Sequence, residues 1–198
     1  MKTALIIGSR SDIAVAAANK LSNQYHVIGI DRTQVDLTDS NSQQKIHDLL
    51  ATHDPDVVVN CTGVFGGNDI DYDTVMDVNL RSNWSVVKYY IDNPPPKTVK
   101  FVMIGSSTYS QGRRNFILYA ASKSALYSMW QGASEFVSPN MVLGLINPVR
   151  VNTKMVSHLQ HPTPELCLEA EDVADKIVDM CNNMITSQSV DMGYKERK

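Results

Sequence analysis

The sequence predicts an α/β fold in which a parallel β-sheet is covered by helices on both faces. Two observations lead to this prediction. Apolar runs that read as strands alternate with longer segments of helical character along the whole chain. These runs are continuous, which is typical of strands buried on both faces of a parallel sheet. The 198 residues suit one domain, because no linker or internal repeat divides them.

Each expected strand is a short run rich in Val, Ile and Leu that ends near a glycine or a polar residue. The first, TALIIG, ends at a glycine, and the third, QVDL, is the briefest. The expected strands, about seven in number, are residues 3–8, 26–31, 34–37, 56–60, 99–107, 141–148 and 187–192.

Each expected helix combines good helix formers with apolar residues three or four positions apart. The second begins at a Ser or Asn cap, and the third ends at NPPPK because proline cannot continue a helix. The expected helices are residues 12–23, 40–53, 73–92, 116–137 and 169–185.

The composition excludes several classes of protein. A formal net charge of −3 lacks the basic surplus that nucleic-acid binding usually requires. No apolar run approaches the roughly 20 residues that span a bilayer, so we expect no membrane segment. Cys61, Cys167 and Cys181 have no metal-ligand spacing, which predicts reduced thiols, no metal site and a cytoplasmic protein.

The turn GSRSDIA, at residues 8–14, joins the first strand to the first helix. A glycine at this place lets the backbone approach a pyrophosphate, whose charge the free amides at the helix start can bind. Gly8 is the only glycine in this turn, so a plain tight turn explains it equally well. We expect Asp12 to be the N-cap of the helix.

A second pattern is Tyr119-x-x-x-Lys123, early in the helix at 116–137. Residues four apart share a helix face, and Ser106 lies thirteen residues earlier, at the end of a strand. The pair can be a catalytic device, or two side chains that only pack on an amphipathic helix.

These motifs resemble those of the short-chain dehydrogenase/reductase family, in the same order over nearly the whole chain. The residues that carry the resemblance are Gly8, Asn60, Gly63, Asn79, Ser106, Tyr119, Lys123, Pro148 and Thr153. The chain departs from the family pattern where that pattern has glycine, at Asp12, Ala14 and Val149. The resemblance implies a Rossmann-like doubly wound sheet and an NAD(P)-dependent oxidoreductase that reduces a carbonyl or oxidises an alcohol.

The resemblance also implies a role for each catalytic residue. Tyr119 is expected to be the acid/base, and Lys123 to lower its pKa and to hold the nicotinamide ribose. Ser106 is expected to orient the substrate oxygen, with Ser107 as the alternative if the loop shifts by one residue. Asn79 would complete a proton relay through water.

The expected cofactor is NAD or NADP. Asp31, at the end of a strand, can bind the adenosine ribose and repel a 2′-phosphate, whereas Arg32 and Arg10 can pair with that phosphate. We favour NAD. Asp36 matches the family's adenine contact, although a turn residue would look the same. The expected cofactor-binding residues are Gly8, Ser9, Arg10, Asp12, Ile13, Asp31, Arg32, Asp36, Leu37, Asn60, Cys61, Gly63, Tyr119, Lys123, Pro148, Val151 and Thr153.

The stretch SSTYSQGRRNFILYAASK, at residues 106–123, together with INPVRVNT, resembles the reductase portion of bifunctional CDP-ribitol synthases, which reduce ribulose 5-phosphate. Arg113, Arg114 and Arg150 would then bind an anionic substrate beside Ser106, because guanidinium groups pair well with phosphate. Alternatively, Arg113 and Arg114 are solvated loop charges or subunit contacts.

We expect residues 1–198 to form one NAD(P)-binding domain with a short substrate lid around 153–167. The helices at 73–92 and 116–137 are where relatives form dimers, so a homodimer or homotetramer is expected. Two other functions stay open. One is a sugar-nucleotide epimerase-like enzyme, for whose substrate domain the chain has no room. The other is a non-catalytic dinucleotide-sensing protein.

Overall fold

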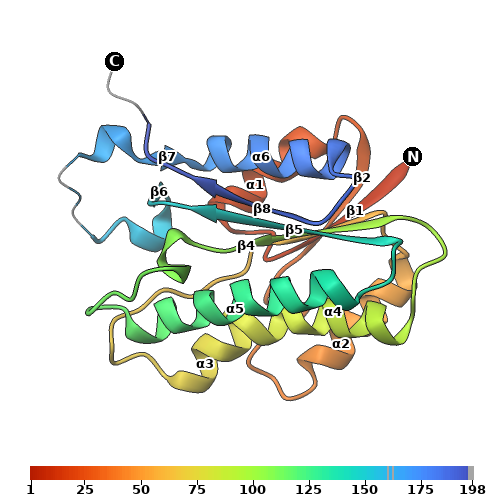
Figure 1. Cartoon of the computed structure of the whole chain (residues 1–198), viewed down its shortest axis with the longest axis horizontal. Helices are drawn as coiled ribbons and strands as arrows, with labels where there is room; N and C mark the ends of the chain where they lie inside the picture. Colours follow the sequence, from red (N-terminus) through yellow and green to blue (C-terminus); the bar gives the residue numbers. More distant parts are fainter. Residues whose placement is uncertain (160, 162, 196–198) are drawn as a thin grey trace.

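Six parallel strands form the central sheet of the protein, which a computed structural model describes for residues 1–159, 161 and 163–195 (Figure 1). The strands are β1 (Lys2–Ile7), β2 (Tyr25–Ile30), β3 (Val57–Asn60), β4 (Val99–Ile104), β5 (Met141–Pro148) and β8 (Gln188–Met192). They lie in the order β2-β1-β3-β4-β5-β8, and every pair is parallel. The doubly wound Rossmann-like fold is therefore confirmed.

Helices cover both faces of the sheet (Figure 1). One face carries α1 (Asp12–Leu21) and α6 (Ala170–Asn183), which pack against each other. The opposite face carries α2 (Ser42–His53), α4 (Ser82–Asp92) and α5 (Ile117–Phe136). A short helix, α3 (Tyr72–Met76), leads into α4.

The two hydrophobic layers follow from the alternation of side chains along each strand. In β1, Ala4 and Ile6 pack with the α1 and α6 layer, whereas Leu5 and Ile7 pack with the α2, α4 and α5 layer. Because both faces are buried, the strand has to be apolar at every position. This is the physical reason for the continuous apolar runs in the sequence.

The segment 34–37, expected to be a brief strand, is not a strand. Its apolar side chains are buried, but its backbone forms turns that polar side chains stabilise. The carboxylate of Asp31 accepts a hydrogen bond from the amide of Thr33 at 2.7 Å, and that of Asp36 accepts one from the amide of Thr38 at 3.0 Å. These local bonds compete with sheet pairing, so the sheet has six strands where about seven were expected.

The expected helix at 73–92 is interrupted by a π-helical turn at Asp77–Arg81. This turn lies between α3 and α4 and faces α5. Asn79, inside it, is fully buried. The irregularity therefore directs a polar side chain into the interior, as π-turns at functional sites often do.

A second, two-stranded sheet was not expected from the sequence. It pairs β6 (Val151–Asn152) with β7 (Leu168–Glu169) in parallel. Two-residue strands carry too little periodicity to be recognised in a sequence. The pairing brings the two ends of the segment 153–167 together, and positions 160 and 162 of that segment lie outside the described residues.

The strand order reverses between β1 and β3, because β1 is followed by β2 on one side and β3 lies on the other. Ligands of such sheets bind beyond the carboxyl ends of the strands at this switch point. Within the described part of the chain, no helix has the length and hydropathy that crossing a membrane requires.

Candidate active site

Two adjoining pockets lie at the carboxyl ends of the strands. The larger has a volume of about 570 Å³ and the smaller about 430 Å³. They share five lining residues, from the first turn and from the end of β3: Arg10, Ser11, Cys61, Thr62 and Gly63. Together they form an elongated site that runs from the end of β2, past β1 and β3, to β4, β5 and the segment 153–167.

The floor between the two pockets depends on Gly8. Its φ is +81°, a left-handed conformation that L side chains rarely adopt. A Cβ at this position would lie 2.8 Å from Cγ2 of Thr62. The backbone of the turn can therefore approach a bound group closely only because residue 8 is glycine.

The N-cap of α1 is Ser11, and the expectation that Asp12 would be the cap is wrong. The hydroxyl of Ser11 accepts a hydrogen bond from the amide of Ala14 at 3.2 Å. Asp12 occupies the first helical position instead, and its carboxylate binds the amide of Lys154 at 2.7 Å. The amides of Asp12 and Ile13 donate to no other described residue. They are left available for an anion at the helix start.

The smaller pocket ends at two ion pairs. Nε of Arg10 lies 2.7 Å from a carboxylate oxygen of Asp31, and Nε of Arg32 lies 2.9 Å from one of Asp36. Hydrogen bonds from Thr33 hold the pKa of Asp31 below its usual value, and Arg10 contributes. Hydrogen bonds from Thr38, with a smaller contribution from Arg32, lower the pKa of Asp36 to about 2. This end of the site therefore carries charges of both signs in surface ion pairs, since both arginine side chains are largely exposed.

Asn60, at the end of β3, shapes the site without lining it. Its amide group donates to the hydroxyl of Ser82 at 3.0 Å, and its carbonyl oxygen accepts from the amide and the hydroxyl of Thr62. Cys61 does line both pockets, but burial raises the pKa of its thiol to about 12. Its thiol therefore stays protonated near neutral pH and is a poor nucleophile.

The side chain of Asn79 is fully engaged in structural hydrogen bonds. Its carbonyl oxygen accepts from the amide of Val64 at 2.8 Å, and its amide group donates to the carbonyl of Val64 and to the hydroxyl of Ser122. It thus ties the loop after β3 to α5, which carries Tyr119 and Lys123. Asn79 does not line either pocket.

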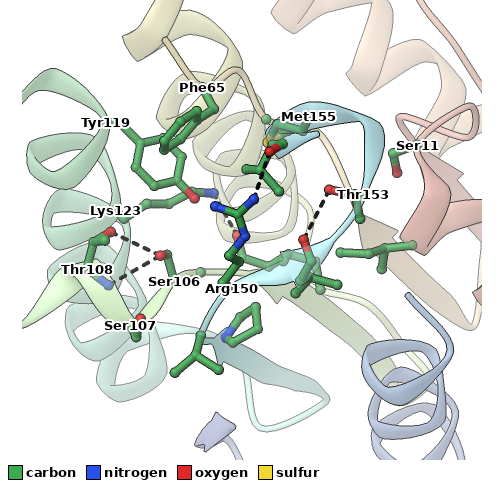
Figure 2. A pocket seen from close by; sticks show the side chains of 18 of the residues that line it. Ser11, Phe65, Ser106, Ser107, Thr108, Tyr119, Lys123, Arg150, Thr153 and Met155 are labelled. Carbon is green, nitrogen blue, oxygen red and sulfur yellow. Dashed lines mark hydrogen bonds between the residues drawn. The ribbon is translucent and has the colours of Figure 1, made fainter. Parts of the chain in front are cut away.

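Ser106, Tyr119 and Lys123 meet at one wall of the larger pocket (Figure 2). Nζ of Lys123 lies 5.7 Å from the centre of the Tyr119 ring and donates to the carbonyl of Ile104 at 2.8 Å. The hydroxyl oxygen of Ser106 accepts from the amide and the hydroxyl of Thr108, at 3.2 Å and 3.0 Å. The hydrogen of the Ser106 hydroxyl is thereby left free to donate elsewhere.

Burial dominates the electrostatics of this wall. It raises the pKa of Tyr119, and hydrogen bonding with Ser106 acts in the opposite direction. It lowers the pKa of Lys123 to about 8, against a small upward effect of Cys61. Low dielectric disfavours the charged form of each group, so the tyrosine is neutral near pH 7.

The three arginines expected to bind an anionic substrate do not all line the larger pocket. Arg113 and Arg150 line the larger pocket, whereas Arg114 does not. One guanidinium nitrogen of Arg150 donates to the carbonyls of Val156 and Leu159, at 2.9 Å and 2.5 Å. Its Nε is buried and has no hydrogen-bond partner within the described residues. Ser107 and Thr108, on the loop after β4, also line this pocket.

Most of the expected site residues line one of the two pockets, and four do not: Ser9, Asn60, Asn79 and Arg114. Several apolar and aromatic residues that line the larger pocket were not expected as site residues: Phe65, Phe116, Met155, Leu159 and Tyr194. Phe65 stacks edge-on against Tyr119 with ring centres 4.8 Å apart. Its one sequence signal is its position, five residues after the end of β3, because loops that follow strand ends line the site in this fold.

Comparisons with known proteins agree with this geometry. The family model for short chain dehydrogenases matches residues 2–163. An NADPH-dependent pterin aldehyde reductase of Arabidopsis thaliana is 26% identical, and the match covers 79% of this chain and 77% of that protein.

Solved structures share the fold. The 3-alpha-hydroxysteroid dehydrogenase of Pseudomonas sp. B-0831, complexed with NADH, superposes with a TM-score of 0.81 at 21% identity, over 97% of this chain and 96% of that one. A short chain dehydrogenase of Burkholderia cenocepacia J2315, in complex with NADP, gives 0.79 at 18% identity, over 97% and 96%. The family match spans most of the chain, and the fold and the paired pockets agree with it. The chain therefore belongs to the short-chain dehydrogenase family, and it is an NAD(P)-dependent oxidoreductase of that family.

Proposed function

We propose that this protein reduces the carbonyl group of a small substrate, with Ser106, Tyr119 and Lys123 as its catalytic residues. The observation that carries the proposal is their convergence on one wall of the larger pocket, next to the pocket that suits the adenosine end of a dinucleotide. The oxidation of an alcohol is the same reaction in reverse. A non-catalytic sensor would have no need of this group of side chains.

The residues present fit a nicotinamide dinucleotide. The free amides of Asp12 and Ile13 would hold its pyrophosphate, and the bare backbone at Gly8 would let it approach. Lys123, Pro148, Val151 and Thr153 would surround its nicotinamide end, since all four line the larger pocket. When bound, the nicotinamide supplies the hydride.

Tyr119 supplies the proton for the substrate oxygen. Its pKa, already about 10 for a free tyrosine, is raised by burial, so near neutral pH the tyrosine carries the proton that carbonyl reduction consumes. Ser106 donates a hydrogen bond to the same oxygen, since its own acceptor sites are used by Thr108. The protonated form of Tyr119, which prevails near neutral pH, is the form that reduction needs, and this supports reduction as the proposed direction.

Lys123 and Asn79 support this step in different ways. One N–H group of the Lys123 ammonium donates to the carbonyl of Ile104. The other two remain available for the ribose and for a water molecule that transfers protons to Tyr119. Asn79 acts by fixing α5 against the loop after β3. Its side chain has no free group for a relay, so any part in proton transfer would fall to its backbone carbonyl, which already accepts from Asn83 at 3.0 Å.

We favour NAD over NADP as the cofactor. The carboxylate of Asp31 is kept ionised by Thr33, and a charged group there repels a 2′-phosphate. The two cations of the region, Arg10 and Arg32, already pair with Asp31 and Asp36. A 2′-phosphate would therefore have to compete with these carboxylates for the two guanidinium groups.

The substrate is proposed to be anionic. Arg113 is exposed and lines the larger pocket, and Arg150 lines it with a buried Nε that has no hydrogen-bond partner among the residues that the structure describes. In Figure 2 the guanidinium of Arg150 projects into the cavity that Tyr119 and Lys123 also line. A phosphate or carboxylate between the two arginines would satisfy that nitrogen.

The decisive experiment is a screen for NADH and NADPH oxidation with phosphorylated ketoses, aromatic aldehydes and simple ketones. Tyr119→Phe is expected to bind the cofactor as the native protein does and to lower kcat at least about 100-fold. Unchanged turnover in this variant would remove Tyr119 from the mechanism. Cofactor binding without turnover of any carbonyl would favour the sensor.

The two neighbouring arginines make a matched pair for the anion site. Arg113→Gln is expected to raise KM for a phosphorylated substrate about tenfold, with little change for a neutral one. Arg114→Gln should leave both values close to native, because this side chain does not line the pocket. Equal effects of the two substitutions would reject the site.

We also propose that the protein is a homodimer or homotetramer. Trp84 on α4 is 37% exposed, and Ile117 and Phe136 on α5 expose large apolar side chains. Burying such groups between subunits would be favourable. Light scattering during size-exclusion chromatography tests this, and a monomer at micromolar concentration would contradict it.

A further inference from the structure

A hydrogen bond joins two regions of the site that lie far apart in the sequence. One carboxylate oxygen of Asp12, in the first turn of α1, accepts from the backbone amide of Lys154 at 2.7 Å, across 142 residues of chain. Asp12 occupies the turn that is proposed to hold the cofactor phosphates. Lys154 begins the segment that follows β6.

That segment covers the larger pocket. Lys154 opens a 3₁₀ turn, Lys154–Val156, and the residues after it, Met155, Val156 and Leu159, all line the pocket. The amide of Lys154 is the first hydrogen-bond donor of this turn, and an amide in this position has no acceptor within the turn itself. Whatever accepts from it fixes where the covering segment starts.

We propose that Asp12 is a positioning residue for the substrate, because its carboxylate seats the segment 153–159 over the pocket through the amide of Lys154. The inference rests on the proposed function, since it assigns the larger pocket to the substrate. Through Asp12, the turn at residues 8–14 that is proposed to bind the cofactor also positions one wall of the substrate pocket.

The bond to the backbone carries this effect, and the ion pair between the two side chains does not. The ammonium of Lys154 is 3.6 Å from the carboxylate, and its side chain is 92% exposed. Exposed pairs of this kind contribute little, whereas a hydrogen bond from an amide to a carboxylate is short and strong. The carboxylate itself is only partly exposed.

A second anchor holds the far end of the same segment. Arg150 donates to the carbonyls of Val156 and Leu159. The loss of the Asp12 bond should therefore loosen the start of the segment without releasing all of it. The expected result is weaker substrate binding in a folded, active protein.

Cofactor binding should respond differently from substrate binding. The carboxylate of Asp12 stands beside amides proposed to bind phosphate, where a negative charge is unfavourable for a second anion. Its removal should leave the dissociation constant of the cofactor unchanged or lower. A rise in substrate KM without weaker cofactor binding is a signature that general destabilisation would not produce.

Two substitutions remove the same bond from opposite sides. Asp12→Ala removes the acceptor. Lys154→Pro removes the donor, and proline suits the first position of a helical turn. Thr153, which precedes it, has φ −139° and ψ 164°, a conformation that residues before proline favour. Each variant is expected to raise substrate KM about tenfold, and the double variant no more than either alone.

Lys154→Ala is the matched control, because it keeps the amide and removes only the ammonium. Its KM should stay within about twofold of native. If Lys154→Ala matches Asp12→Ala while Lys154→Pro has no effect, the ion pair holds the segment and the proposal is wrong. Additive effects of Asp12→Ala and Lys154→Pro would also reject it.

Hydrogen exchange measured by mass spectrometry provides a readout independent of turnover. Peptides covering 153–159 should exchange at least several-fold faster in Asp12→Ala than in the native protein, whereas peptides of β4 and β5 should not change. If no carbonyl is reduced but this difference is present, the proposed function fails and the anchoring by Asp12 stands. If exchange of 153–159 is unchanged, the anchoring fails whatever the activity.

Discussion

The ammonium of Lys123 lies 5.7 Å from the ring centre of Tyr119, one turn away along α5, and points to the carbonyl of Ile104. Lys123 is buried and Tyr119 is half-buried, so each resists the charge that its catalytic role involves. The tyrosine keeps its proton, and the pKa of the lysine falls to about 8. Burial raises the pKa of Tyr119 and Ser106 is the group that opposes this rise, so the expected lowering by the lysine charge is not seen.

Burying Lys123 should destabilise the folded protein at neutral pH. Since each pKa unit corresponds to about 1.4 kcal/mol, a fall from 10.5 to about 8 costs roughly 3 kcal/mol when the lysine is charged in both states. Lys123→Met is expected to raise the free energy of unfolding at pH 7, by less than this amount because the hydrogen bond to Ile104 is lost. The same variant should lose most of its activity.

The pH dependence of that difference has a definite sign. Between about pH 8 and 10.5 the unfolded lysine holds its proton and the folded one does not, so the native protein gains stability as pH rises. The advantage of Lys123→Met, measured by urea unfolding of both proteins, should shrink across this window. An advantage that is constant from pH 7 to 10.5 would contradict the depressed pKa.

Asp31→Asn should shift cofactor preference towards NADP. The amide keeps the size of the side chain and an acceptor for Thr33, but it removes the charge that repels a 2′-phosphate. We expect the ratio of kcat/KM for NADPH to that for NADH to rise at least about tenfold. Steady-state rates with both cofactors test this, and an unchanged ratio would show that Asp31 does not face the ribose.

Asn79→Ala should destabilise the fold more than an average surface change. Its three side-chain hydrogen bonds to Val64 and Ser122 are lost, and buried polar groups are left without partners. The expected loss in the free energy of unfolding is about 2–4 kcal/mol. Asn19→Ala, on the exposed side of α1, is the control and should change it by less than about 0.5 kcal/mol. Similar values for the two would refute the structural role of Asn79.

Gly8→Ala should weaken both folding and cofactor binding, because an alanine at φ +81° is strained and its Cβ meets Thr62. A loss of about 1–3 kcal/mol in the free energy of unfolding is expected. Gly132→Ala is the opposite case: it lies in α5, and a Cβ there meets nothing within 4 Å. That variant should gain up to about 1 kcal/mol. Thermal unfolding of both proteins compares the two signs directly.

Much of this fold could be predicted because its strands are buried on both faces. The segment 34–37 could not, since Asp31 and Asp36 form local turns whose strength does not show in an apolar pattern. The strands β6 and β7 are too short to have a period. Helix starts were predicted to within a few residues, but the choice of Ser11 over Asp12 as N-cap depends on where the extended backbone turns helical, and both residue types suit a cap.

That Ser106, Tyr119 and Lys123 line one pocket was predictable, because it depends on spacing within one element or between neighbouring elements. Tyr119 and Lys123 share a turn of α5, and Ser106 lies two residues beyond the end of β4, the strand before it. The contact of Asp12 with Lys154 has no such spacing, because it joins residues brought together only by the whole topology. Arg113 and Arg114 illustrate a further limit: successive loop residues face different surroundings, and the sequence does not say which one lines the pocket.

The π-helical turn at Asp77–Arg81 makes the length of this helix as important as its composition. A π-turn holds one residue more than an α-turn, and each residue of an α-helix advances by about 100°. Because the π-turn takes up that extra residue within one turn, deleting one residue there would restore a regular helix and keep Val86 and Tyr90 of α4 in the core, whereas the side chain of Asn79 would lose its place. The length of this turn should therefore decide where the side chain of Asn79 lies and not how α4 packs, and a one-residue gap placed there when related chains are aligned is compatible with an unchanged α4.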